Sequence, residues 1–315
     1  MNTDAISNDA RATVKNLRSF YGKFSQVVRI ENGLERLMDF RCLNEEPECL
    51  AVIGETGTGK STILNRFACR YPRVSHAEFT EIPVLLVPVP AKCTIKLLSA
   101  EALAVMGSPF AARGNEVELT TQLLTLLAAC RTRVIIFDEV NHLSDRGGQK
   151  SHYLVGDWIK SLSYKSKLPI ILVGTPAAQV LWRTNEQLGD RFHEAIHLRA
   201  LTHVKDDLVE LKTVLKAFSK VAGSFECVDF QEDANAAAMA MASGGRLRNI
   251  RSLYVRAVEI AAREGVRVIS RKTFAQAFRE RIFSGCPDSR NPFTAKFDGK
   301  VLAGTGEPFA PRSKP

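Results

Sequence analysis

A glycine-rich loop is the strongest chemical signal in this sequence of 315 residues. It fits the pattern GxxxxGK[ST], in which glycines let the backbone curl so that successive N–H groups point at phosphate oxygens. In this pattern Lys60 neutralises charge on the β- and γ-phosphates, and Ser61 ligates Mg²⁺. A chance glycine-rich turn is the alternative, which the match at every fixed position disfavours. The predicted phosphate-binding residues are Gly54, Glu55, Thr56, Gly57, Thr58, Gly59, Lys60, Ser61 and Thr62.

Asp138 and Glu139 directly follow an apolar run at residues 134–137. If this run is a strand of a parallel sheet, both carboxylates emerge at the edge where phosphates bind. We expect Asp138 to hold Mg²⁺ through water, and Glu139 to orient and polarise the attacking water as a general base. An ordinary turn residue at a strand end is the alternative for Asp138. Because the sequence has no NKxD element for reading a guanine base, it predicts an ATPase that uses ATP and Mg²⁺.

Further residues are candidates for sensing the γ-phosphate or completing the site. Thr175 follows another apolar run, where its hydroxyl would lie near the γ-phosphate; a simple turn residue is the equal alternative. Arg191 is the first candidate for an arginine finger that reaches a neighbouring subunit's nucleotide, and Arg183 is the second. Solvated surface arginines are the alternative for both. Arg248 opens a predicted helix after two glycines, and we expect it to fold back onto the nucleotide.

Residues 193–197 match HExxH, the motif of zinc proteases. That motif needs both histidines on one face of a substantial helix. Here the surrounding sequence predicts a short strand, which would separate His193 and His197 by about 13 Å at a rise near 3.3 Å per residue. The context therefore argues against a zinc site.

These residues need a sheet to position them. Apolar runs of Val, Ile and Leu occur at residues 50–53, 84–87, 134–137 and 170–173, and the segments between them are long enough for crossover helices. The first run stops at the glycine-rich loop, which is followed by a predicted helix at residues 61–70. Strands of this kind that alternate with helices predict a parallel sheet covered on both faces.

Changes in pattern along the chain predict its domains. Residues 1–47 show helical spacing and are interpreted as a helical lead-in to the main domain at residues 48–200. Residues 201–283 form a separate helical subdomain, with predicted helices at 204–222, 231–243, 247–264 and 271–283. Residues 284–315 contain few large apolar side chains, so we expect a flexible C-terminal tail.

The net charge of +9 is unevenly distributed. Residues 245–315 contain 15 basic and 6 acidic residues, and therefore carry the whole excess, while the first 244 residues balance to zero. A basic C-terminal part beside a neutral body is typical of a protein of which one part meets a polyanion.

The cysteines and the hydropathy pattern indicate where the protein acts. No apolar stretch approaches the 18 residues that a membrane span needs, and the N-terminal residues contain no apolar core of a signal peptide. We therefore expect a cytoplasmic protein without a membrane partner. Most of the seven cysteines have apolar neighbours and are interpreted as reduced core residues: Cys42, Cys49, Cys69, Cys93, Cys130, Cys227 and Cys286.

The order of these motifs resembles an AAA+ ATPase of the initiator-like branch. More narrowly, the segments CLAVIGETGTGKST, VPVPAKCTIKLLSAEALAVMGSP, VIIFDEVNHL and PIILVGTPAA are similar to the TniB/TnsC family of bacterial transposition regulators. The resemblance implies an α/β AAA+ P-loop domain with a parallel sheet covered by helices on both faces, followed by a small α-helical lid subdomain. It also implies ATP-dependent homo-oligomers, rings or filaments, on double-stranded DNA, which link a TniQ-type target selector to a DDE transposase.

The same resemblance implies that Lys92, Thr94 and Lys96 contact the DNA backbone from inside such a ring. Each of these side chains can meet a phosphate, by charge or by hydroxyl, without reading bases. A solvated loop and helix start is the alternative for the two lysines.

The sequence therefore predicts an ATP-dependent DNA-binding regulator of DNA transposition, in which hydrolysis drives disassembly. A helicase-loader or replication-initiator ATPase is the first alternative, and a nucleotide-switched signalling or secretion ATPase without DNA contact is the second. A small-molecule kinase is a weaker third alternative.

Overall fold

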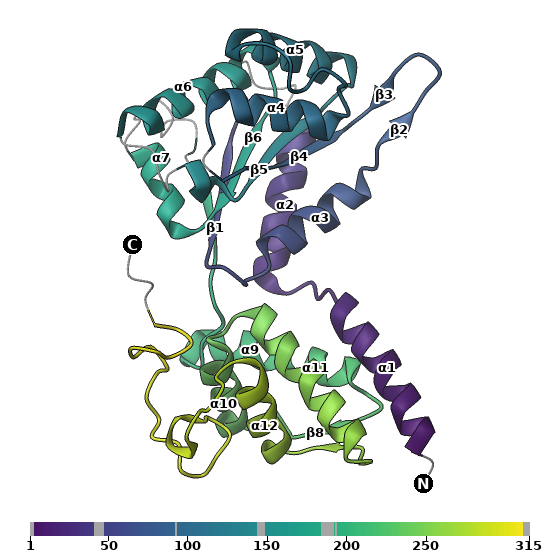
Figure 1. Cartoon of the computed structure of the whole chain (residues 1–315), viewed down its shortest axis with the longest axis vertical. Helices are drawn as coiled ribbons and strands as arrows, with labels where there is room; N and C mark the ends of the chain where they lie inside the picture. The colour runs from purple at the N-terminus through teal and green to yellow at the C-terminus, as the bar shows by residue number, and fades with distance from the viewer. Residues whose placement is uncertain are drawn as a thin grey trace. The chain divides into compact units, whose positions relative to one another are not determined.

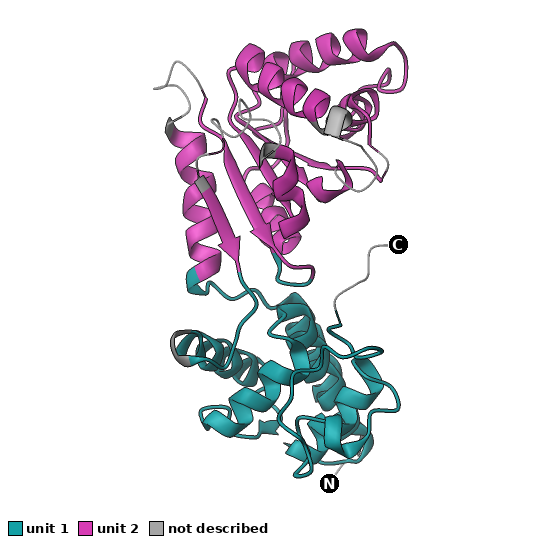
Figure 2. Cartoon of the chain, turned by 90° about the vertical axis from the view of Figure 1, so that its left-hand side faces the viewer, with its two compact units in different colours: residues 1–25, 57–59, 199–315 teal, residues 26–56, 60–198 magenta. Residues whose placement is uncertain are grey.

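The computed structural model describes residues 3–40, 47–91, 93–143, 149–183, 192 and 194–310 (Figure 1). Its contacts divide the chain into two compact units (Figure 2). Unit 1 comprises residues 1–25, 57–59 and 199–315, and unit 2 comprises residues 26–56 and 60–198. The catalytic candidates on strands therefore belong to unit 2, and the predicted helical subdomain belongs to unit 1.

A five-stranded sheet forms the centre of unit 2. Its order is β4 (Val84–Pro88), β5 (Val134–Asp138), β6 (Ile170–Gly174), β1 (Leu50–Gly54) and β7 (Glu194–Leu198), and every neighbouring pair is parallel. All residues of β1, β5 and β6 are buried, which explains their unbroken apolar sequences. The four strands predicted from apolar runs are confirmed, and each extends one residue further than expected.

Helices cover both faces of this sheet (Figure 1). On one face, Ala51 and Ile53 of β1 join an apolar cluster with α4 (Ile95–Met106), α5 (Glu116–Ala129) and α6 (Gln149–Ser166). On the other face lies α2 (Ser25–Phe40), where a Cβ at Gly33 would be 3.0 Å from the side chain of Ile196. The predicted doubly covered parallel sheet is therefore confirmed.

Short elements connect these layers. The loop after β1 leads into α3 (Lys60–Arg70), and a small hairpin of β2 (Val74–Ser75) and β3 (Thr80–Glu81) follows. The 3₁₀ helices η1 (Val140–Leu143) and η2 (Pro176–Gln179) follow β5 and β6, and α7 (Val180–Arg183) continues from η2. A capping box fixes the start of α5, because the side chains and backbone N–H groups of Asn115 and Glu118 bond reciprocally.

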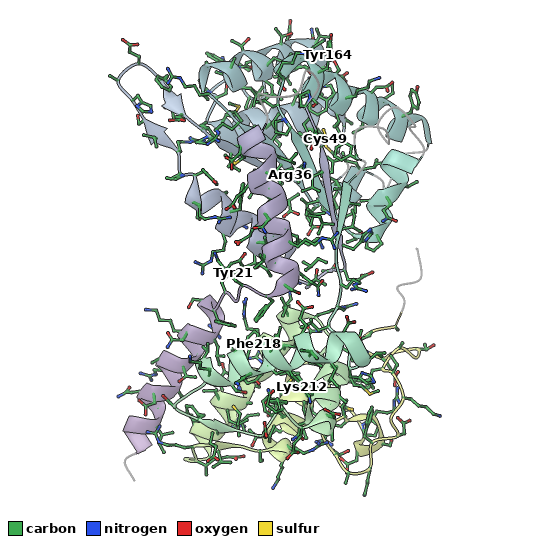
Figure 3. The ribbon with its side chains drawn as sticks, turned by 180° about the vertical axis from the view of Figure 1, so that it is seen from behind. Tyr21, Arg36, Cys49, Tyr164, Lys212 and Phe218 are labelled. Carbon is green, nitrogen blue, oxygen red and sulfur yellow. The ribbon has the colours of Figure 1, made fainter. Side chains whose placement is uncertain are left out.

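Unit 1 is a helical bundle around an aromatic core. Its helices are α1 (Thr3–Ser19), α9 (Lys205–Val221), α10 (Asp233–Ser243), α11 (Leu247–Arg263) and α12 (Arg271–Arg281), close to the predicted ranges after residue 200. The strands β8 (Glu226–Cys227) and β9 (Val268–Ile269) pair between them. Buried Tyr254 stands between Phe218, labelled in Figure 3, and Phe274, with ring centroids 5.4 Å from each.

The N-terminal segment differs from the expected single lead-in to the main domain. Helix α1 belongs to unit 1, where it packs along α11 and buries Ile6, Ala10 and Leu17, whereas most of α2 belongs to unit 2. The helical spacing was visible in the sequence, but the choice of packing partner depends on residues more than 200 positions away.

The expectation of a C-terminal tail that buries little surface is wrong for residues 286–302. Cys286, Phe293 and Leu302 are buried in the core of unit 1, and Phe293 stacks on Phe274 with ring centroids 5.4 Å apart. Arg290, the last residue of the short helix η3 (Asp288–Arg290), bonds to Glu307 at 2.6 Å. A few well-placed anchors therefore hold a segment whose average composition indicates disorder.

Among the described residues, no helix combines the length and the apolar character needed to cross a lipid bilayer. The described cysteines carry free thiols, and Cys49 and Cys286 are buried. Cys69 is exposed, so the interpretation of the cysteines as core residues fails there.

We predict that Phe293→Ala lowers the free energy of unfolding by about 3 kcal/mol, because it leaves a cavity beneath a packed aromatic pair. Chemical denaturation of the full chain measures this change. Lys296→Ala, at an exposed position of the same segment, is the control and should shift stability by less than about 0.5 kcal/mol. Equal effects of the two substitutions would show that the segment does not pack in solution.

Candidate nucleotide site

The strand register brings the predicted chemical residues to one edge of the sheet. Asp138 is paired with Val173 across β5 and β6, and Ile53 is paired with Gly174 across β1 and β6. Strand β6 lies between β5 and β1. Thr175 directly follows β6, so it lies at the sheet edge between the glycine-rich loop and the carboxylate pair. The carboxyl ends of parallel strands form the usual ligand site of such a sheet.

The loop between β1 and α3 has the backbone that a phosphate cradle requires. Gly57 and Gly59 have φ angles of 86° and 111°, in the left-handed region that favours glycine. The side chain of Lys60 is buried, and its Nζ donates to the carbonyl oxygens of Gly54, at 2.6 Å, and Glu55, at 3.1 Å. The ammonium group is thus held inside the loop, next to the N-terminus of α3.

The remaining loop residues differ in exposure. Thr58 is buried, whereas the side chains of Glu55, Thr56 and Thr62 are exposed and that of Ser61 is half-buried. The backbone N–H groups are the expected phosphate ligands in such a loop, so exposed side chains are compatible with that role.

Asp138 and Ser61 form an oxygen pair that fits Mg²⁺. The Ser61 side chain lies near Asp138, which is only 8% exposed. Burial raises the pKa of Asp138, and the interaction with Ser61 and the charge of Lys60 oppose this rise. A carboxylate and a hydroxyl at the edge of a phosphate cradle are ligands that Mg²⁺ prefers, and a bound cation would stabilise the charged form of Asp138.

Glu139 is held in a strained backbone conformation. Its φ is 60°, in the left-handed region, although it is neither glycine nor asparagine. Its backbone N–H donates to Oδ1 of Asp138 at 2.9 Å, which helps to hold this turn. A strained residue persists only where the surrounding structure holds it in place. Such residues are concentrated at functional sites.

The proposed sensors are only partly described. Thr175 precedes η2, and its backbone N–H lies 3.4 Å from Oδ1 of Asn141, a residue that the sequence analysis missed. Arg183 ends α7 and nothing is described of its side chain, and Arg191 lies outside the described residues. Arg248 is in the first turn of α11, where its backbone N–H donates to Gly57, another residue of unit 1, at 3.0 Å.

The HExxH pattern lies on a strand. His197 is an exposed residue of β7, which pairs with β1 through its whole length, and His193 lies outside the described residues. The predicted short strand is therefore confirmed. Within the described ranges, no three His, Cys, Asp or Glu side chains come together as metal ligands.

The family model described as "Bacterial TniB protein" matches residues 16–201. The chain belongs to the TniB family. The match covers the sheet, the glycine-rich loop and the carboxylate pair, and it confirms the resemblance drawn from the motifs. No curated protein matches the sequence.

Solved structures show that this TniB protein has the AAA+ fold. The Aeropyrum pernix ORC1 protein in complex with DNA has 17% identity and a TM-score of 0.58, and the match covers 84% of this chain and 65% of that one. Cdc6p from Pyrobaculum aerophilum has 14% identity and a TM-score of 0.62, with 86% and 71% covered. Drosophila ORC bound to DNA has 17% identity and a TM-score of 0.57, with 89% and 69% covered.

The segment expected to contact DNA is the N-terminus of α4. Thr94 is the N-cap of this helix, and its hydroxyl accepts from the backbone N–H of Leu97 at 3.2 Å. Lys96 is exposed in the first turn, and Lys92 lies outside the described residues. Thr94 therefore has a structural task in the TniB chain that the sequence analysis did not assign to it.

The strain at Glu139 yields a stability prediction. Glycine adopts a positive φ without steric cost, so Glu139→Gly should be more stable to chemical denaturation than Glu139→Ala by about 1 kcal/mol. Glu101, inside α4, is the control, because there the glycine variant should be the less stable one by about 1 kcal/mol. The same order of stability at both positions would contradict the strained conformation of Glu139.

Proposed function

We propose that this TniB-family chain is an ATP-dependent, DNA-binding AAA+ ATPase that regulates DNA transposition. The observation that carries the proposal is the convergence of the glycine-rich loop and the Asp138–Glu139 pair at one edge of the sheet, in a chain of the TniB family. In this proposal ATP favours oligomers on DNA, and hydrolysis disperses them.

The positions of Lys60, Ser61, Asp138 and Glu139 in unit 2 support the proposed catalytic roles. Lys60 and the loop N–H groups bind the phosphates, while Ser61 and Asp138 hold Mg²⁺, which would supply charge neutralisation at the β- and γ-phosphates. Glu139 accepts a proton from the water that attacks the γ-phosphate. Its backbone N–H donates to Oδ1 of Asp138, so the two residues share one short turn.

Three further residues complete the proposed site. Thr175 contacts the γ-phosphate from the end of β6, since that strand ends between the loop and the carboxylates. Arg191 acts as a finger on the nucleotide of a neighbouring subunit, which makes assembly and hydrolysis interdependent. Arg248 contacts the nucleotide from the start of α11.

Duplex DNA is the proposed partner of the α4 N-terminus. Lys92 and Lys96 supply charge there, and Thr94 supplies a hydroxyl, so that the contacts are to the backbone and not to the bases. Two proteins of similar fold, the Aeropyrum pernix ORC1 protein and Drosophila ORC, were solved with DNA, which supports a DNA-related role. The exposed position of Lys96 is compatible with it.

The biological setting of the proposal comes from the family. A TniB protein would act in the bacterial cytoplasm as a homo-oligomer, a ring or a filament, and would link a TniQ-type target selector to a DDE transposase. A helicase-loader or replication-initiator role is the second candidate, supported by the fold likeness to the ORC and Cdc6 proteins. The TniB match favours transposition over it.

Two substitutions test the ATPase cycle. Lys60→Ala should abolish ATP-dependent retention of duplex DNA, because the phosphates lose their cation. Glu139→Gln should prolong retention and reduce hydrolysis by at least about 100-fold, because the water loses its general base. Retention is measured by mobility shift with ATP, and hydrolysis by phosphate release.

Lys216→Ala, at an exposed lysine of α9, is the control for loss of a lysine and should resemble the parent chain in both assays. A Glu139→Gln protein that binds ATP but never associates with DNA would contradict the proposed cycle. Retention without any nucleotide would contradict it as well.

A further inference from the structure

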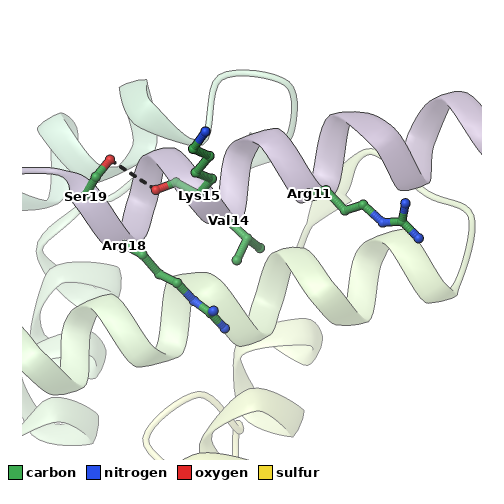
Figure 4. A pocket seen from close by; sticks show the side chains of 5 residues that line it. All are labelled: Arg11, Val14, Lys15, Arg18 and Ser19. Carbon is green, nitrogen blue, oxygen red and sulfur yellow. Dashed lines mark hydrogen bonds between the residues drawn. The ribbon is translucent and has the colours of Figure 1, made fainter.

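Helix α1 of unit 1 carries a row of cations on one side. Arg11, Lys15 and Arg18 are spaced by four and three residues, so they lie on one face of the helix over about 10 Å. With Val14 and Ser19 they line an open depression of about 520 Å³ (Figure 4). We call these three side chains the α1 basic face.

The carboxylates near this face are already shared among arginines. Arg18 is 3.8 Å from Glu259, and both Glu259 and its neighbour Glu280 accept more than one arginine. Glu259 also pairs with Arg256 at 2.8 Å and with Arg281 at 3.3 Å. Glu280 pairs with Arg256, and with Arg263 at 3.8 Å. Two carboxylates therefore face four arginines.

Arg11 and Lys15 add to this excess. Within the part of the chain that the structure describes, neither makes an ion pair, and both are exposed. Asp9, two residues before Arg11, is paired with Arg267 at 2.5 Å and so does not neutralise it. Positive charge thus accumulates on the α1 basic face, in the unit that contains the basic residues 245–315.

The charge of the depression selects the kind of partner. Three of its five described lining residues are the cations Arg11, Lys15 and Arg18. Duplex DNA suits such a surface, because it presents about one charge per 1.7 Å of its axis to lysine and arginine.

We propose that the α1 basic face binds the phosphate backbone of duplex DNA, as a contact surface on unit 1 separate from the α4 N-terminus. The inference rests on the proposed DNA-binding function and assigns a second surface to it. Each cation displaces condensed counterions from the duplex, so the face strengthens binding most at low salt.

The test is the salt dependence of DNA binding by Arg11→Gln/Lys15→Gln in the full chain. Duplex DNA of arbitrary sequence and a non-hydrolysable ATP analogue are used, and affinity is measured by fluorescence anisotropy between 50 and 200 mM salt. Loss of two phosphate contacts should make the decline in affinity over this range about tenfold smaller than in the parent chain. The affinity for the analogue without DNA and the thermal midpoint should not change.

Lys216→Gln/Lys220→Gln is the matched control. It removes two exposed lysines, also four residues apart, from α9. The inference would be overturned if the α1 variant had the same salt dependence of DNA affinity as the parent chain. It would also be overturned if the α9 variant changed the salt dependence as much as the α1 variant does. Either result would leave the proposed function intact. A parent chain that binds no duplex at any salt would overturn both.

A second observation, in unit 2, concerns Val89. Its backbone N–H donates to the carbonyl oxygen of Asp138 at 2.8 Å, and its own carbonyl oxygen lies 2.9 Å from Nδ1 of His142. Because a carbonyl can only accept, Nδ1 of His142 carries the proton. One buried residue after β4 is therefore bonded to both sides of the turn that contains Glu139.

The chain continues from Val89 to the α4 N-terminus. Val89 stands between Pro88 and Pro90, whose rings restrict the backbone of this stretch. Thr94, the N-cap of α4, lies only five residues after Val89. A shift of the Asp138–Glu139 turn therefore acts on Val89, which stands between two prolines and five residues before Thr94.

The geometry points to His142 as a positioning residue that couples the nucleotide site to the DNA-contacting segment. This inference also rests on the proposed function. His142 touches neither the phosphate loop nor the α4 N-terminus in the described contacts, so its effect passes through Val89.

His142→Ala and His142→Asn test the coupling. The ratio of DNA affinity with and without the ATP analogue should fall about fivefold in His142→Ala, which loses one hydrogen bond. His142→Asn should retain the ratio, because its amide N–H₂ can still donate to Val89. Analogue affinity without DNA should be equal in all three proteins.

An unchanged ratio in His142→Ala, or equal loss in both variants, would overturn the coupling role. A parent chain whose DNA affinity does not respond to the analogue would overturn the proposed function together with it.

Discussion

A buried carboxylate at the edge of the sheet is the constraint on which the rest of unit 2 depends. Asp138 ends a wholly apolar strand, and burial raises its pKa while Ser61 and Lys60 oppose the rise. Such a group is costly to ionise unless a cation is near. The order β5-β6-β1 and the parallel register bring the glycine-rich loop to the same edge, so one Mg²⁺–nucleotide complex would satisfy both the carboxylate and the loop N–H groups.

The sequence predicts the sheet well, because strands buried on both faces must be apolar along their whole length, and residues such as Leu50 and Ile171 meet that condition. The phosphate loop is predictable for a similar reason, since only glycine adopts the φ of Gly57 at little cost. Contacts such as Val89 with His142 join segments 53 residues apart, and no spacing rule reveals them. The burial of Phe293 was missed because composition averages over a segment, whereas packing depends on single anchors.

The two units divide the chemistry of this TniB protein. Unit 2 contains Lys60, Ser61 and the Asp138–Glu139 pair, and unit 1 contains residues 245–315 with their excess of positive charge. Helix α1 also belongs to unit 1, although it lies far from residues 245–315 in the sequence. Its cations therefore add to the positive charge of unit 1. In the proposed function, a nucleotide would bind at the sheet edge of unit 2, and duplex DNA would contact the α4 N-terminus and the α1 basic face.

Calorimetric titration of the purified chain with an ATP analogue tests the central claim most directly. The account predicts one nucleotide per chain, with binding that depends on Mg²⁺ and disappears when Asp138 is replaced by alanine together with Ser61. Absence of nucleotide binding in the parent chain, or binding that is unaffected by Mg²⁺ and by these replacements, would contradict it.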